Sequence, residues 1–86
     1  MHEMSLALEI CRITEEQVGA EALPRVREVG LRVGLDSGVE PDALEFALSV
    51  LLSEPPFQGA RAVLEVGPGD DLRVGWLEVE DDRPPH

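Results

Sequence analysis

The chain has 86 residues and a mass of 9.4 kDa, the size of one small domain with no room for a second. Its 18 Asp and Glu residues outnumber 7 basic residues, all of them Arg, and the net charge is −11. Such a surface repels phosphate backbones and anionic lipid headgroups, which excludes nucleic acid and membrane surfaces as partners. A chain this short buries only about 60–65% of its unfolded surface, too little for a full core and a deep catalytic cavity together.

Cysteine usage and the N-terminal residues narrow the class of protein further. The single cysteine, Cys11, excludes an internal disulfide framework and a zinc ribbon formed by this chain alone. Glu3 and Glu9 stand where a secretory leader would be basic, and no run approaches the roughly 20 apolar residues of a membrane span. We therefore expect a cytoplasmic protein.

The first predicted element is an amphipathic helix over Met4–Val18. Its apolar residues recur at spacings of three and four, with charged residues on the other side. Cys11 lies among the apolar positions and is expected to be a small core residue. Gly19 ends the helix, and Ala20–Pro24 forms a connection because proline is excluded from a helix interior.

A strand and a second helix follow. Apolar and other residues alternate over Val26–Val33, which predicts a strand with one face on the core. Pro41 suits the first position of the next helix, which Ser53–Pro56 terminates. The apolar positions of this helix are almost continuous and include Phe46, so we expect it to be the more buried helix and Phe46 to lie in the core.

The last two predicted elements are short strands, Ala62–Val66 and Leu72–Glu80, joined by the turn Gly67–Asp71. The apolar residues of the final strand change parity part-way along it. A bulge at Gly75–Trp76 returns all of them to one face, and it directs the indole of Trp76 away from the helices.

The predicted order is therefore α-β-α-β-β. The economical packing is an α/β fold (an α+β sandwich) with two helices on one face of a three-stranded mixed sheet. Residues 1–80 form a single domain, and the charged, proline-bearing residues 81–86 are expected to be a flexible acidic tail.

The first three residues carry the most distinctive chemistry in the chain. Met1, His2 and Glu3 place a free amine, an imidazole and a carboxylate directly before a helix. With deprotonated backbone amides they form a planar, nitrogen-rich ligand set that suits Ni(II) or Cu(II) better than Zn(II). A histidine at position two is also common as an exposed residue, so the chemistry alone leaves both interpretations open.

Five segments in register carry a family resemblance: Met1–Ala7, Arg27–Gly34, Val39–Ala47, Gly59–Val66 and Leu72–Glu80. In this order they resemble the opening, the first strand, the start of the second helix and the two strands around the zinc domain of the HypA/HybF family. That family comprises hydrogenase nickel-incorporation accessory proteins. The resemblance runs from the first residue to about Glu80.

One part of the family pattern is absent. In the family, two CxxC pairs between the last two strands form a structural zinc site, whereas here Gly67–Asp71 joins these strands directly. The sequence thus resembles a family member without its zinc module, and no zinc is expected. The departure puts in doubt whatever that module contributes to dimerisation or partner docking.

The resemblance implies a metallochaperone that binds nickel and delivers it, with a GTPase partner, to maturation of a hydrogenase or urease precursor. Carried over by residue, His2 supplies its imidazole, the backbone nitrogens of His2 and Glu3 are in-plane ligands, and the Met1 amine is a further ligand. The Glu3 carboxylate tunes charge or contacts a partner.

The rival interpretation is a paralogue without the zinc module that acts as a protein-interaction or regulatory module without a metal. No catalytic set can be assembled from two histidines in so small a fold, so no enzyme activity is expected.

Two interpretations of Trp76 remain open. In the first, the indole belongs to a contact surface for a homodimer or another partner. In the second, the indole folds over the shortened turn Gly67–Asp71.

Overall fold

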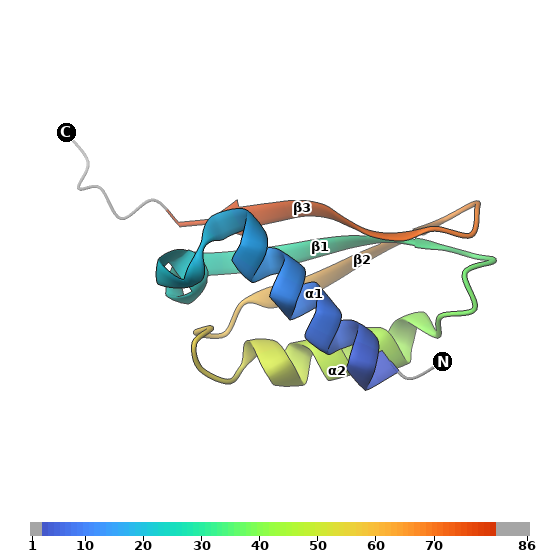
Figure 1. The fold of residues 1–86 in the computed structure, drawn as a ribbon. Helices are drawn as coiled ribbons and strands as arrows, with labels where there is room; N and C mark the ends of the chain where they lie inside the picture. Colours follow the sequence, from blue (N-terminus) through green and yellow to red (C-terminus); the bar gives the residue numbers. More distant parts are fainter. Residues whose placement is uncertain (1–2, 81–86) are drawn as a thin grey trace.

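The computed structural model describes residues 3–80 and confirms the predicted order of helices and strands, with one short 3-10 helix added (Figure 1). The predicted tail, residues 81–86, lies outside the described residues. The elements are α1 (Glu3–Val18), η1 (Ala20–Arg25), β1 (Val26–Gly34), α2 (Pro41–Leu52), β2 (Arg61–Gly67) and β3 (Leu72–Val79).

The first helix ends as the sequence predicts, but the connection after it is more regular. Gly19 takes φ 86°, a left-handed conformation that glycine adopts without steric cost. The chain then forms η1 with Pro24 inside it, so the prediction that Pro24 lies outside any helix is wrong. Proline has no backbone N–H and so removes one hydrogen bond from a helix. In a 3-10 helix as short as η1 this loss is small.

The second helix begins at Pro41 as predicted, and the Glu40 side chain accepts a hydrogen bond from the backbone N–H of Asp42. It is the more buried helix, with four buried residues of 12 against three of 16 in α1. Phe46, however, is 72% exposed, which corrects its predicted place in the core. A helix buries one side, and the leucines of α2 at spacings of four, together with Ala47, occupy it.

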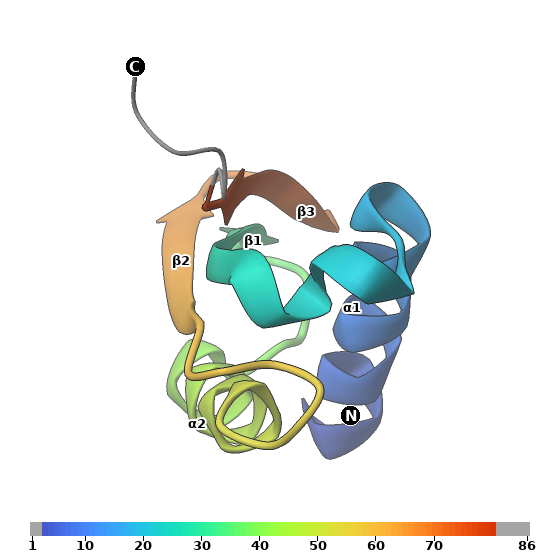
Figure 2. The ribbon, with the colours of Figure 1, turned by 90° about the vertical axis from the view of Figure 1, so that its left-hand side faces the viewer.

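The three strands form a mixed sheet in the order β2-β1-β3, with β1 parallel to β2 and antiparallel to β3. Both long helices lie on the same face of this sheet and leave the other face open (Figure 2). The predicted two-layer arrangement is therefore confirmed. The strands β2 and β3 are consecutive in sequence. They are not neighbours in the sheet, because β1 lies between them.

The turn between β2 and β3 therefore has to cross the end of β1. Gly34 donates its backbone N–H to Asp71 O at 2.7 Å, and Leu35 donates to Gly67 O at 2.8 Å. A side chain at Gly34 would overlap the backbone of Gly69, so the crossing needs glycine at this point of β1. The predicted turn is thus an arch over the central strand.

The core lies between the sheet and the helices. Phe57, after α2, is 6% exposed and provides the phenyl ring of the core in place of Phe46. Thr14 is a buried polar residue of α1, and its hydroxyl donates to Ile10 O at 2.8 Å, which satisfies it inside the helix. The fully buried larger apolar side chains are Leu23, Val26, Val29, Leu31, Val33, Leu44, Leu48 and Leu52.

Within residues 3–80, no helix has both the length and the apolar character needed to cross a membrane.

Candidate functional site

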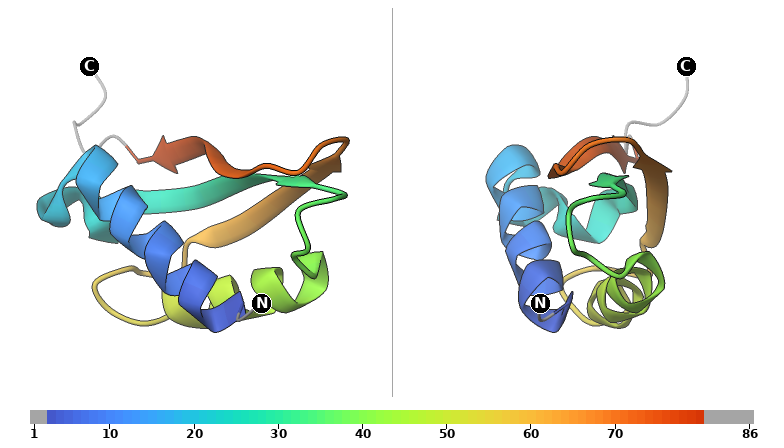
Figure 3. Two further views of the ribbon diagram at one scale, coloured as in Figure 1. Left: turned by 45° about the vertical axis from the view of Figure 1, so that its right-hand side comes forward. Right: turned by 90° about the vertical axis from the view of Figure 1, so that its right-hand side faces the viewer.

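The starts of α1 and α2 lie beside each other at one end of the molecule (Figure 3). Glu3 opens α1, and its carboxylate accepts a long hydrogen bond of 3.5 Å from the backbone N–H of Glu40. Asp42 lies in the first turn of α2. These carboxylates stand at the positive ends of two helix dipoles, where negative charge is favourable. The N-terminal segment therefore leads directly into an acidic corner.

Of the predicted nickel ligands, the structure locates only Glu3. Met1 and His2 lie outside the described residues. Within residues 3–80, no group of three or more His, Cys, Asp or Glu side chains is arranged to hold a metal ion. The ligand set Met1, His2 and Glu3 therefore stays a prediction.

Cys11 is half-buried on α1 and packs against the core. Burial raises the pKa of its thiol, because the charged thiolate loses hydration there. A thiol with a raised pKa is a poor nucleophile and a poor metal ligand at neutral pH. Its position agrees with the predicted role as a small core residue.

The predicted bulge in β3 is confirmed. Leu31 pairs with Val74 and Gly30 pairs with Trp76, which leaves Gly75 as the extra residue. The shift returns the apolar residues after it to the helix side of the sheet. Leu72, Val74 and Leu77 pack against the core, although Val79 stays 37% exposed near the end of the strand.

Trp76 consequently lies on the open face of the sheet, where it is held by several contacts. Its Nε1–H donates to a Glu28 carboxylate oxygen at 2.7 Å, and Arg61 donates to the other oxygen of Glu28 at 2.9 Å. The guanidinium carbon of Arg32 stands 5.9 Å from the indole centroid, within the range of a cation–π contact. The side chain is half-buried.

The indole covers Gly30 in the middle of β1, whereas the arch crosses β1 at Gly34. Any side chain at Gly30 would overlap the six-membered ring of Trp76. Sequence reasoning selected Trp76 but missed Glu28 and Arg32, which hold it. The available signal was Gly30 itself, because glycine inside a strand marks a close approach of another group.

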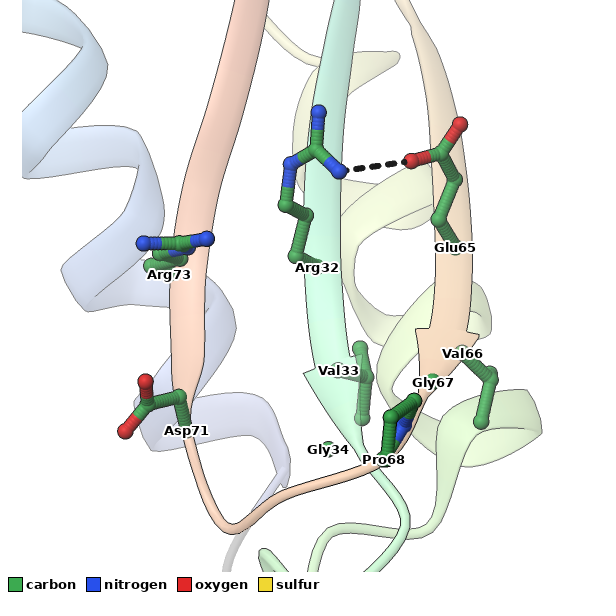
Figure 4. A pocket seen from close by; sticks show the side chains of 9 residues that line it. All are labelled: Arg32, Val33, Gly34, Glu65, Val66, Gly67, Pro68, Asp71 and Arg73. Atoms are coloured by element: carbon green, nitrogen blue, oxygen red, sulfur yellow. Dashed lines mark ion pairs between the residues drawn. The ribbon is translucent and has the colours of Figure 1, made fainter.

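A shallow hollow of about 300 Å³ lies on the open face beside the arch (Figure 4). Arg32 forms an ion pair with Glu65 across it at 3.3 Å. Arg73 stands directly opposite Arg32 on β3 and has no ion pair among residues 3–80. Asp71 lines the same hollow, so its charges are mixed.

Comparison with known proteins decides the family. A family model described as hydrogenase/urease nickel incorporation, metallochaperone, HypA matches residues 1–71. The chain belongs to the HypA family. The predicted family resemblance is therefore confirmed, and the match reaches from the N-terminal segment to the arch before β3.

Two HypA relatives give the extent of the similarity. The hydrogenase maturation factor HypA of Alkalilimnicola ehrlichii is 40% identical over 78 residues, which cover 91% of this chain and 69% of that protein. The protein of the same name from Geobacter metallireducens is 41% identical over 69 residues, covering 80% of this chain and 60% of the relative. The chain thus spans about 60 to 69% of the length of these relatives.

Proposed function

We propose that this chain is a cytoplasmic nickel-binding accessory protein that holds Ni(II) at Met1, His2 and Glu3 and passes it to maturation of a nickel enzyme such as [NiFe] hydrogenase. It acts as a carrier rather than as an enzyme. The observation that carries the proposal is the HypA family match, which begins at residue 1 and includes this segment.

The chemistry of the segment supports nickel as the cargo. The Met1 amine, the His2 imidazole and backbone nitrogens are the donors that a square-planar Ni(II) ion prefers. The acidic corner formed by Glu3, Glu40 and Asp42 adds negative charge nearby and raises the local concentration of divalent cations. In this proposal, no zinc is required for the fold, because one cysteine is all that the chain offers to a zinc module.

The decisive experiment is a titration of Ni(II) into tag-free protein with an unblocked Met1, at pH 7.5, by calorimetry and visible absorption. We expect binding of one ion per chain with a planar d–d absorption band. His2→Ala removes the imidazole and should abolish both signals. Because His2 must be neutral and amide protons must leave, the affinity should fall steeply below about pH 6.5.

The matched control is His86→Ala, which makes the same chemical change at the other histidine of the chain. This variant should bind nickel as the natural sequence does. Glu3→Gln separates the two roles proposed for that carboxylate. A moderate loss of affinity with an unchanged absorption band indicates that Glu3 tunes charge, and unchanged affinity indicates that it contacts a partner instead. A changed band would contradict both roles and make the carboxylate a ligand. If His2→Ala binds as well as the unsubstituted chain, nickel delivery by this segment is refuted.

The second candidate function is a protein-interaction or regulatory module without a metal. One observation favours it: the ordered cluster of Trp76, Glu28 and Arg32 on a sheet face that no other element of residues 3–80 covers. Failure of the nickel titration would make this the leading interpretation.

For the nickel carrier, the first of the two proposed functions, the protein partner that we propose is a GTPase of the maturation pathway.

A further inference from the structure

The outer edge of β3 has no partner strand within residues 3–80, because β3 ends the sheet and pairs with β1 alone. The direction of its backbone groups follows from one hydrogen bond. Gly34 donates to Asp71 O, and inward-facing pairs alternate along an antiparallel ladder. Arg73 therefore forms the next inward pair, and the N–H and C=O groups of Leu72 and Val74 point outward.

Beside this edge runs a groove of about 540 Å³, bounded by α1 on one side and by β3 on the other. Ile13 and Gln17 line it from α1. Leu72, Val74 and Leu77 line it from β3, and each is only partly buried. An unpaired strand edge next to partly exposed apolar side chains can accept one more extended segment.

Arg73 places a positive charge on the open face of the same edge, two residues after Asp71. Arg73 is exposed there and has no ion pair among residues 3–80. Its neighbour across the ladder is Arg32, and like charges directly opposite each other are unfavourable. An acidic side chain on an added strand would stand beside Arg73 and offset this repulsion. Although Asp71 keeps the charge of the hollow mixed, Arg73 is a local position suited to a negative group in a chain of net charge −11.

We propose that the outer edge of β3 binds an extended segment of a protein partner by antiparallel strand addition, and that the segment has an apolar–acidic–apolar pattern. The backbone of the segment bonds to Leu72 and Val74. Its two apolar side chains enter the groove against Ile13, and the acidic side chain between them faces Arg73. Pairing stops at the Gly75 bulge, where the ladder is interrupted. This inference is independent of nickel binding and is tested without metal.

The test uses ¹⁵N-labelled protein and the acetylated, amidated peptide Thr-Val-Glu-Val-Thr. We expect amide shifts centred on Leu72 and Val74 in NMR titrations. The matched peptide with Lys in place of Glu should bind about fivefold more weakly, as expected for one cross-strand charge pair. Arg73→Glu should reverse this preference. Arg12→Glu makes the same charge change on the solvent side of α1 and should leave the preference unchanged.

A third peptide, N-methylated at both valines, separates strand addition from simple charge attraction. It keeps every side chain but lacks the N–H groups that would bond to β3, so it should not bind. Equal binding of the methylated peptide, or an unchanged preference in Arg73→Glu, refutes the proposal. A concentration-dependent dimer in sedimentation that Arg73→Glu abolishes would also overturn it, because the edge would then belong to a second copy of the chain.

Discussion

The two faces of β1 are stabilised by different kinds of interaction. Towards the helices, Val29, Leu31 and Val33 are at most 2% exposed and form a continuous apolar surface. Towards solvent, Gly30 lies under the Trp76 indole and Arg32 reaches both Glu65 and that ring. Burial of apolar surface is non-directional, whereas the open face depends on particular partners at particular distances.

The inner face of β1 therefore contributes most to stability, and the open face fixes one specific local arrangement. A buried leucine contributes through many small contacts and can be replaced by another side chain of similar volume. The contacts around Trp76 are few, and each of them joins the indole to one particular residue. Substitutions on the inner face should therefore cost more free energy, and those on the open face should change one local arrangement.

The largest effect is expected for Leu31→Ala. The side chain is fully buried in the middle of the central strand, and its truncation leaves a cavity between sheet and helices. The free energy of unfolding should fall by about 2–5 kcal/mol, measured by urea denaturation. Leu31→Met, which conserves volume, is the control and should cost less than about 1.5 kcal/mol. An Ala variant as stable as the Met variant would contradict a tightly packed inner face.

A smaller effect is expected for Gly30→Ala on the opposite face. The added methyl group would overlap the indole of Trp76, which has to swing away and release Glu28. We expect a loss of about 1–3 kcal/mol. The same substitution in a Trp76→Ala background should cost much less, because the overlapping ring is gone. Additive costs in this double-mutant cycle would show that the indole does not lie on Gly30.

Trp76→Phe tests the polar contact alone. It keeps an aromatic ring over Gly30 but removes the N–H that donates to Glu28. Because Glu28 is still paired with Arg61, the expected cost is about 1 kcal/mol. In Glu28→Gln, which keeps a hydrogen-bond acceptor, the Trp76 fluorescence maximum should move little. A large red shift in that variant would mean that the carboxylate charge holds the indole.

The smallest effect is expected on the solvent side of α1, where Arg12 pairs with Glu9 and Glu16. The hydrogen bond from Arg12 lowers the pKa of the Glu9 carboxyl. Its contribution is therefore present above the ordinary pKa of a glutamate and is lost as the pH falls through the lowered value. In Arg12→Ala, NMR titration should show Glu9 protonating at a higher pH. Thermal stability at neutral pH should barely change, because both groups are exposed.

Several features of the fold could be predicted from local sequence, while the contacts of the open face could not. The Gly75 bulge followed from the change of parity along the final strand, and the start of α2 followed from Pro41. Phe46 was placed wrongly because an almost continuous apolar run hides which side of a helix faces the core. The partnership of Trp76 with Glu28 spans 48 positions, and no local pattern encodes such a distance.

The order of the two long helices and the three strands could be read from the sequence, because proline, glycine and apolar spacing act over a few residues. The family could be read from five matching segments. Only the three-dimensional structure shows that β1 lies between β2 and β3, that the turn arches over Gly34 and that the outer edge of β3 has no partner strand within residues 3–80. The physical reason is that strand order is set by how the helices and the sheet jointly bury their apolar faces. That property belongs to the whole chain.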